Sequence, residues 1–131
     1  MKKMTKFINE EFLDVLFDKG PATIVSVNGN PASVVNTWTQ YISVVRDNTL
    51  LIPAAGMHSI ENDFKNDPKH DLTIAIGSYN YEGKAGMGRG YHIHGRGEFI
   101  TEGEYFEQMK AQFDWIRAVL IVKIHDIEQK I

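Results

Sequence analysis

Short apolar runs separated by turn signals are the feature that most limits the folds open to this chain. Strand-like runs are predicted at residues 22–27, 33–45, 50–52, 72–76, 91–100 and 118–124, and the run at 33–45 is long enough for one or two strands. Asn28-Gly29-Asn30 is a hairpin signal between the first two runs. Parallel neighbours would each need a crossover connection, usually a helix, and the predicted helices are too few to supply them. The sequence therefore predicts a mainly β, antiparallel barrel rather than a doubly wound parallel sheet.

A few helices are predicted between these strands. Asn9 is placed to cap the first helix, and Ser59 is placed to cap a short second one. Thr101-Glu102-Gly103-Glu104 matches a capping box before a third helix that runs through Phe113. The glycines at residues 83–90 predict a loop before the strand at 91–100.

Size and composition exclude several classes of function. The 131 residues have the length of one domain, so we expect a single domain over residues 1–131. The chain has no cysteine, which excludes disulfides and thiolate chemistry and leaves redox chemistry to a bound cofactor. The 14 basic residues are scattered and the net charge is −3, which argues against a nucleic-acid partner. Without a membrane-length apolar run or a signal pattern after residues 1–6, we expect a cytoplasmic protein with no membrane partner.

His92-Ile93-His94 places two imidazoles on one face of a strand, where both could reach one metal ion. A metal site needs a third ligand. The candidates are His58, His70, His125 or a carboxylate, and the spacing along the chain does not choose among them. We therefore assign no metal site from the sequence.

The segment Gly86-Met87-Gly88-Arg89-Gly90 resembles a nucleotide-binding glycine loop in composition, but the predicted elements on either side of it differ from those of such a loop. Such a loop follows a strand and opens a helix, whereas this segment leads into the strand at 91–100. A turn between strands is the simpler interpretation. Arg89, flanked by glycines, is still well placed to reach an anion.

Asn36-Thr37-Trp38, Tyr41 and Trp115 combine aromatic rings with hydrogen-bonding side chains. Such a mixture can line a slot for a flat ring system, although the same aromatics can equally belong to the core. No nucleophile–base–acid arrangement is visible, and we assign no catalytic residue.

Several segments taken together resemble small stand-alone FMN-binding proteins of the FMN-binding split-barrel superfamily, whose best-known enzyme is pyridoxamine 5′-phosphate oxidase. The resemblance runs from the first predicted helix to Ile131. Its most specific parts are Asn-Thr-Trp at residues 36–38 and Pro-Ala-Ala-Gly-Met-His at residues 53–58. The segments that carry it are Val34-Val35-Asn36-Thr37-Trp38-Thr39-Gln40-Tyr41, Ile52-Pro53-Ala54-Ala55-Gly56-Met57-His58, Gly77-Ser78, residues 86–95 and Phe113-Asp114-Trp115-Ile116-Arg117-Ala118-Val119-Leu120.

The resemblance implies a six-stranded antiparallel split β-barrel that forms a homodimer, with one FMN per subunit at the interface. Residues 36–38 would follow the ribityl chain and the ring, residues 54–60 would surround the phosphate, and Trp115 would shield the ring. The last residues would dock near the partner's flavin. The expected cofactor-binding residues are Val35, Asn36, Thr37, Trp38, Tyr41, Pro53, Ala54, Ala55, Gly56, His58, Ser59, Ile60, Gly77, Ser78, Arg89, Trp115 and Ile131.

The chain departs from the family at the phosphate end. Relatives commonly carry a basic residue at the start of the short helix, where this chain has Ser59-Ile60 followed by Glu61 and Asp63. These carboxylates would repel a phosphate. Another cation would have to replace the missing one, with Arg89 expected first and His58 or Lys84 next. The alternatives are that hydroxyls and backbone amides suffice to bind the phosphate, or that FMN binds more weakly than in relatives.

The resulting functional expectation is an FMN-binding protein that acts in electron transfer or as a small flavin-dependent oxidoreductase. A pyridoxamine 5′-phosphate oxidase is one alternative, although the sequence shows no basic cluster for a second phosphorylated ligand. A non-catalytic flavin-binding or metal-binding module is the other. The electron donor, the acceptor and any substrate are not determined by the sequence.

Overall fold

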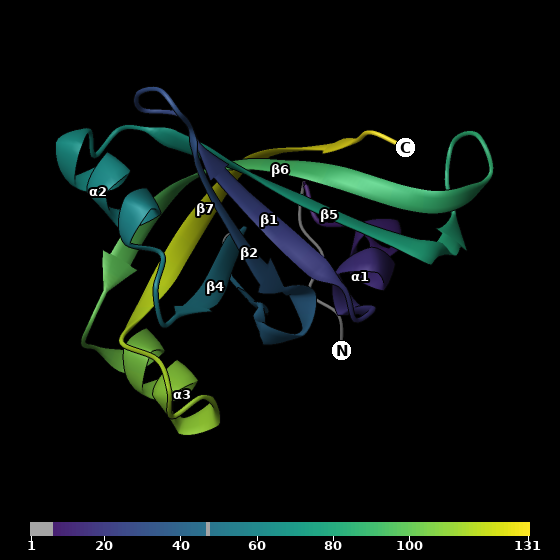
Figure 1. The fold of residues 1–131 in the computed structure, drawn as a ribbon. Coiled ribbons are helices and arrows are strands. Elements are labelled where there is room, and N and C mark those ends of the chain that lie inside the picture. The colour runs from purple at the N-terminus through teal and green to yellow at the C-terminus, as the bar shows by residue number, and fades with distance from the viewer. Residues whose placement is uncertain (1–6, 47) are drawn as a thin grey trace.

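The computed structural model describes residues 7–46 and 48–131, and over these residues the chain forms one seven-stranded antiparallel sheet (Figure 1). The strand order is β2-β1-β5-β6-β7-β4-β3. The sheet curls, so that β2 and the end of β4 line a common cleft although they are far apart in this order. The strands are β1 (Pro21–Ser26), β2 (Ser33–Trp38), β3 (Ser43–Val45), β4 (Thr49–Ala54), β5 (Asp71–Glu82), β6 (Met87–Ile100) and β7 (Ala118–Gln129).

The antiparallel, mainly β architecture is confirmed, but the expected number of six strands is wrong. A short 3-10 helix, η1 (Thr39–Tyr41), divides the run at residues 33–45 into β2 and β3. Thr39 causes this break because its buried hydroxyl donates to the Asp18 carbonyl at 2.7 Å and accepts from the Gly20 N–H at 3.2 Å. Three-residue β3 then pairs with β4 as an additional edge strand.

The first helix, α1 (Glu10–Phe17), closes the main hydrophobic core. Its cap is the predicted one, since the Phe12 N–H donates to the Asn9 side chain at 2.9 Å. The helix buries Phe12, Leu13, Val15 and Leu16 against the inner face of the sheet. Burial of each large apolar side chain contributes about 1.5–3 kcal/mol.

A smaller hydrophobic cluster lies under α3 (Glu104–Gln112) on the other face of β4 and β7. Leu51 belongs to this cluster, whereas its neighbours Leu50 and Ile52 belong to the main core. Every residue of β4 is therefore buried, and the strand is packed on both faces. This packing gives the connection after Ala54 a fixed starting point.

Two predicted helix caps are wrong. The second helix, α2 (His58–Asn66), begins before Ser59, after Met57 in the left-handed region with φ of 65°. The third begins after Gly103, whose φ of 101° suits glycine, so Thr101 does not cap it. In both cases the chain enters the helix through a positive φ rather than through a side-chain cap.

The strands β5, β6 and β7 extend beyond their predicted apolar runs. The predicted loop at residues 83–90 is shorter than expected, because Met87 pairs with Glu82 and Gly90 pairs with Gly77. β7 likewise continues past residue 124 and pairs with β6 up to Gln129. These outer parts are polar, so hydrophobic alternation does not reveal them.

No described helix is long and apolar enough to cross a membrane. The expectation about a signal pattern concerns residues 1–6, which lie outside the described residues. The cytoplasmic location stays a prediction.

Candidate functional site

A cleft of about 510 Å³ lies between β2 and the connection from β4 to α2. Nine of the expected cofactor-binding residues line it, together with Met57, which the sequence analysis did not single out. The complete lining is Val35, Asn36, Thr37, Trp38, Tyr41, Pro53, Ala55, Gly56, Met57 and Trp115. Residues that are distant in the sequence thus meet in one place, as the resemblance implied.

Aromatic rings form one side of the cleft. Tyr41 and Trp115 have ring centroids 5.4 Å apart, and Phe113 stands behind both at 5.2 and 5.6 Å. Trp38 and Trp115 are 50% and 46% exposed, which is unusual for the largest apolar side chain. Neither indole is therefore an ordinary core residue, and both are available to a ligand.

Local contacts fix where the aromatic residues stand. Trp115 lies in a turn after α3, and Lys110 holds this turn by donating to the Asp114 and Ile116 carbonyls at 2.6 and 3.1 Å. The hydroxyl of Thr39 ties η1, and with it Tyr41, to the loop after α1. Contacts between protein groups therefore hold the aromatic side of the cleft in place.

Polar groups lie beside the rings. The Asn36 side-chain oxygen accepts a hydrogen bond from the Thr23 hydroxyl at 2.7 Å, which leaves the amide NH₂ as a potential donor to a ligand. The lining of the cleft ends at Met57, the residue before α2, and the first bond of the helical ladder runs from the Glu61 N–H to the Met57 carbonyl. The N–H groups of residues 58–60 lie outside that ladder, at the positive end of the helix dipole, and so form an anion-binding position.

Arg117 places a cation at the same end of the cleft. Its guanidinium donates to the Ala55 and Gly56 carbonyls at 3.1 and 2.6 Å and to the Glu61 carboxylate at 2.9 Å. Arg117 reaches this loop because it immediately precedes β7, and its own N–H bonds to the Ala54 carbonyl. The carboxylate of Glu61, expected to repel a phosphate, is therefore paired.

The remaining expected residues of this segment contribute in different ways. Ala54 is buried in β4, and Ile60 is buried against the main core, so Ile60 offers only its backbone. His58 and Ser59 are exposed in the first turn of α2. Asp63 is turned into the protein and is only 9% exposed.

Four expected residues lie elsewhere in the chain, at the far end of β5 and β6. Gly77 pairs with Gly90, and Ser78 pairs with Arg89. The Gly90 N–H donates to the Ile131 carbonyl at 3.1 Å, which ties the C-terminus to β6. None of Gly77, Ser78, Arg89 and Ile131 lines the cleft of the same chain. We call these four residues the far-end group.

Arg89, one of the far-end group, contacts residues of α1 and β5. Its guanidinium donates to the Glu82 and Glu11 carbonyls at 2.8 and 3.1 Å and lies 3.8 Å from the Asp14 carboxylate. The guanidinium carbon also stands 5.3 Å from the centre of the Tyr81 ring. Arg89 thus ties α1 to the ends of β5 and β6. Arg89 does not line the cleft of its own chain, and its expected contact with a phosphate stays a prediction.

Ser78 makes a hydrogen bond to the carboxylate of Asp18. Its hydroxyl donates to Asp18, and the Asn80 side chain donates to the same oxygen at 2.8 Å. These two hydrogen bonds, the one from Ser78 first, hold the pKa of Asp18 below its ordinary value.

Sequence reasoning missed Met57 and Arg117. Met57 lies inside the Pro-Ala-Ala-Gly-Met-His segment and within residues 54–60, which were expected to surround the phosphate, but it was not named among the cofactor-binding residues. Arg117 was quoted in the segment around Trp115 without being considered as the cation. Arg117 reaches the start of α2 only because it lies opposite the end of β4.

Comparison with known proteins identifies the family. A family model described as pyridoxamine 5′-phosphate oxidase matches residues 8–130. The FMN-binding protein of Nitratidesulfovibrio vulgaris (strain Miyazaki F) is 33% identical over 118 residues, which cover 90% of this chain and 94% of that protein.

Solved structures share the fold at low sequence identity. HupZ of Group A Streptococcus superposes with a TM-score of 0.76 at 18% identity, covering 95% of this chain and 94% of that one. An FMN-binding protein from Syntrophomonas wolfei superposes with a TM-score of 0.64 at 16% identity, covering 84% and 76%. These likenesses establish the split-barrel fold, while the sequence match carries the family relationship.

Proposed function

This chain belongs to the pyridoxamine 5′-phosphate oxidase family, and we propose its function on that basis. Within that family, we propose that the protein binds FMN in the cleft between β2 and the β4–α2 connection. The observation that carries the proposal is a cleft with aromatic rings along one side and a helix N-terminus with a guanidinium at its end. A flavin mononucleotide has a flat ring at one end and a phosphate at the other, and the donor set fits both.

Each part of the cleft has a stated task in this proposal. Trp38, Tyr41 and Trp115 contact the ring, and Asn36 and Thr37 hydrogen bond to the polyol chain. The N–H groups at the start of α2 and the guanidinium of Arg117 bind the phosphate. Bound FMN would supply one- and two-electron redox chemistry, which no side chain of this cysteine-free protein supplies.

Electron transfer is the reaction class that we propose. Among the described lining residues, Tyr41 is the only titratable one, and no carboxylate or imidazole lines the cleft to move a substrate proton. The lining also lacks a lysine or arginine for a second phosphorylated ligand, which disfavours a pyridoxamine 5′-phosphate oxidase reaction. Half-exposed indoles leave a path for electrons to and from a partner.

We also propose that the protein is a homodimer in which Ile131 of one chain completes the cleft of the other. On β2, Val34 and Trp38 are 57% and 50% exposed on one face of a strand at the sheet edge. Exposed apolar surface of this kind marks an interface. Ile131 is 59% exposed although its backbone is tied to Gly90, so its side chain is free to contact a second copy. Sedimentation at micromolar concentration should give twice the chain mass; a monomer that holds FMN contradicts this proposal.

The test of the cofactor is direct. The purified protein should carry a yellow chromophore that is released as FMN, and the flavin-free protein should bind FMN more tightly than riboflavin because only FMN reaches the helix start. Trp38→Ala should weaken both flavins, whereas Phe17→Ala, which removes an aromatic ring that is 55% exposed outside the cleft, should change neither. A protein that binds no flavin contradicts the proposal.

The reaction class has a separate test. Dithionite should reduce the bound flavin reversibly, and pyridoxamine 5′-phosphate should not reduce it under anaerobic conditions. Reduction by that substrate with release of the aldehyde would contradict electron transfer and favour the oxidase.

A further inference from the structure

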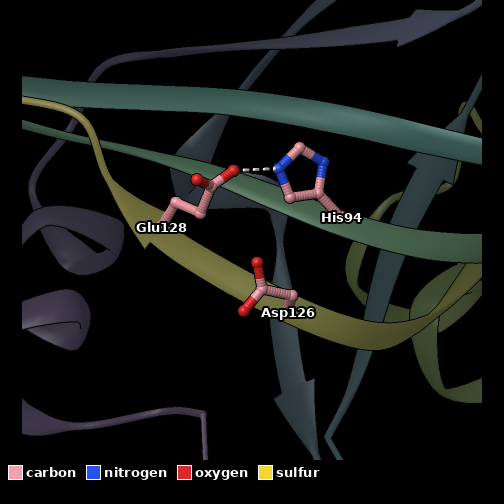
Figure 2. Close-up of side chains that lie close together, drawn as sticks. All are labelled: His94, Asp126 and Glu128. Atoms are coloured by element: carbon pink, nitrogen blue, oxygen red, sulfur yellow. Dashed lines mark hydrogen bonds and ion pairs between the residues drawn. The ribbon is translucent and has the colours of Figure 1, made fainter.

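We propose that His94, Asp126 and Glu128 form a binding site for a divalent transition-metal ion, separate from the flavin cleft. Figure 2 shows the three side chains converging from β6 and β7. One ligand atom from each, the imidazole nitrogen and two carboxylate oxygens, lies within 4.8 Å of the others. None of the three residues lines the flavin cleft.

A β-bulge brings the two carboxylates to the face that carries the histidine. On β6, Ile93 and Gly95 point into the protein, and His94 between them points outward. On β7, Val122 and Ile124 are buried, so regular alternation would turn residues 126 and 128 inward as well. The pairing instead shifts between His94 and Gly95, where Gly95 faces Ile124 and His94 faces Asp126.

The shift leaves His125 as the extra residue and reverses the orientation of the strand beyond it. Ile127 therefore packs against the core, while Asp126 and Glu128 face outward beside His94. Each carboxylate thus lies opposite a histidine of β6: Asp126 opposite His94, and Glu128 opposite His92. The third ligand that the sequence did not identify is thus supplied by the register of β7.

The imidazole of His94 is already oriented for this role. The Thr73 hydroxyl on β5 lies 3.1 Å from Nδ1, and the Glu128 Oε1 lies 2.7 Å from Nε2. A hydrogen bond at the ring nitrogen that does not bind the ion commonly fixes a metal-binding histidine. Thr73 makes that bond and directs Nε2 toward the two carboxylates.

The donor set determines the kind of ion. One imidazole and two carboxylates suit a divalent ion of intermediate softness such as Zn²⁺, and the two negative charges balance its charge. Ligand bonds of about 2.0–2.2 Å require the spacing of the three atoms to adjust around the ion, which rotation of the exposed Asp126 and Glu128 side chains allows. Water and His92, whose ring centre is 6.3 Å from that of His94, are available to complete the coordination.

An ion binds Nε2 only when that nitrogen carries no proton, so the neutral imidazole in the metal-bound form keeps its one proton on Nδ1, beside the Thr73 hydroxyl. The hydrogen bond between Nε2 and Oε1 is replaced by bonds from both atoms to the ion. The nearest competing cation is Lys130, whose amine lies 4.0 Å from the other oxygen of Glu128. That amine is half exposed and can move away into solvent. The ion would then join β6 to β7 directly beside the bulge.

The experiment uses the full chain after treatment with a chelator, titrated with Zn²⁺ by calorimetry. The wild-type protein should bind one ion per chain, and Zn²⁺ should raise its melting temperature, because an ion that binds only the folded chain stabilises it. His94→Ala, Asp126→Asn and Glu128→Gln should each weaken binding at least about tenfold, since even loss of an outer hydrogen bond costs that much at metal sites.

His125→Ala is the matched control. His125 lies on the same strand, is exposed, and stands 3.4 Å from the Asp71 carboxylate, but it has no second carboxylate within reach of its ring in the described part of the chain. Its loss should leave Zn²⁺ affinity unchanged. Co²⁺ added in place of Zn²⁺ should give visible absorption in the wild type and not in His94→Ala.

Three results would overturn the site: no stoichiometric Zn²⁺ binding by the wild type, binding that survives in His94→Ala, or equal loss in His125→Ala. The three substituted side chains are at the surface, and melting curves without metal check that each variant is folded. Flavin binding by His94→Ala should match the wild type, which separates this site from the proposed cofactor cleft.

Discussion

The start of α2 and the far end of β5 and β6 each hold an arginine in nearly the same kind of environment. Arg117 donates to two loop carbonyls and pairs with Glu61, and Arg89 donates to two backbone carbonyls and lies near Asp14. Only Arg117 stands beside the free N–H groups of a helix at the end of an aromatic cleft. The two arginines therefore differ in their place relative to a helix terminus, and this difference is the basis for proposing Arg117 rather than Arg89 as the phosphate-binding cation.

The largest expected effect separates the two arginines by affinity. Arg117→Ala should weaken FMN binding about 10- to 100-fold, because a charge-assisted hydrogen bond contributes about 1.5–3 kcal/mol. Riboflavin, which has no phosphate, should bind to this variant as it does to the wild type. Titrations followed by flavin fluorescence measure both affinities, and an equal loss for both ligands would mean that Arg117 only holds the loop.

Arg89→Ala should show the opposite behaviour. Its loss removes the contacts that tie α1 to β5 and β6, so the free energy of unfolding should fall by about 1–2 kcal/mol in urea. FMN affinity should stay the same in our proposal. Selective loss of FMN affinity would instead show that Arg89 contacts the phosphate, as the sequence analysis expected.

Trp115→Ala tests the aromatic side of the cleft with a smaller effect. Loss of one ring contact should weaken FMN binding about 2- to 10-fold, since such contacts contribute about 0.5–1.5 kcal/mol. The melting temperature of the flavin-free protein should change little because the indole is 46% exposed. FMN should also quench much of the wild-type tryptophan emission. A large fall in melting temperature with unchanged FMN affinity would make Trp115 a structural residue.

The smallest expected effect concerns Ser78 in the far-end group. The pKa of Asp18 is lower in the folded protein than in the unfolded chain, so ionised Asp18 stabilises the fold above pH of about 4. This contribution disappears as the pH falls through the lowered folded-state pKa. Ser78→Ala should therefore reduce stability at pH 7 and flatten its decline below pH 4, as measured by thermal unfolding. An unchanged pH profile would mean that Asn80 alone holds the carboxylate.

Much of the cleft could be predicted because its parts are short, continuous segments. Asn36-Thr37-Trp38 and the residues from Pro53 to Gly56 carry recognisable local patterns, and the structure brings both segments to one cleft. The cap of α1 at Asn9 was likewise predictable, because the capping bond spans only three residues.

What the sequence alone determined is the set of local elements: antiparallel strands with turn signals, a first helix with its cap, and the segments that carry the family pattern. The tertiary structure decided which distant groups meet. Arg117 reaches α2 through the pairing of β4 with β7, and the bulge at His125 turns Asp126 and Glu128 outward. The physical reason is that strand register is a long-range property: one inserted residue reverses the orientation of every later side chain, and residue identities taken locally do not show where that insertion falls.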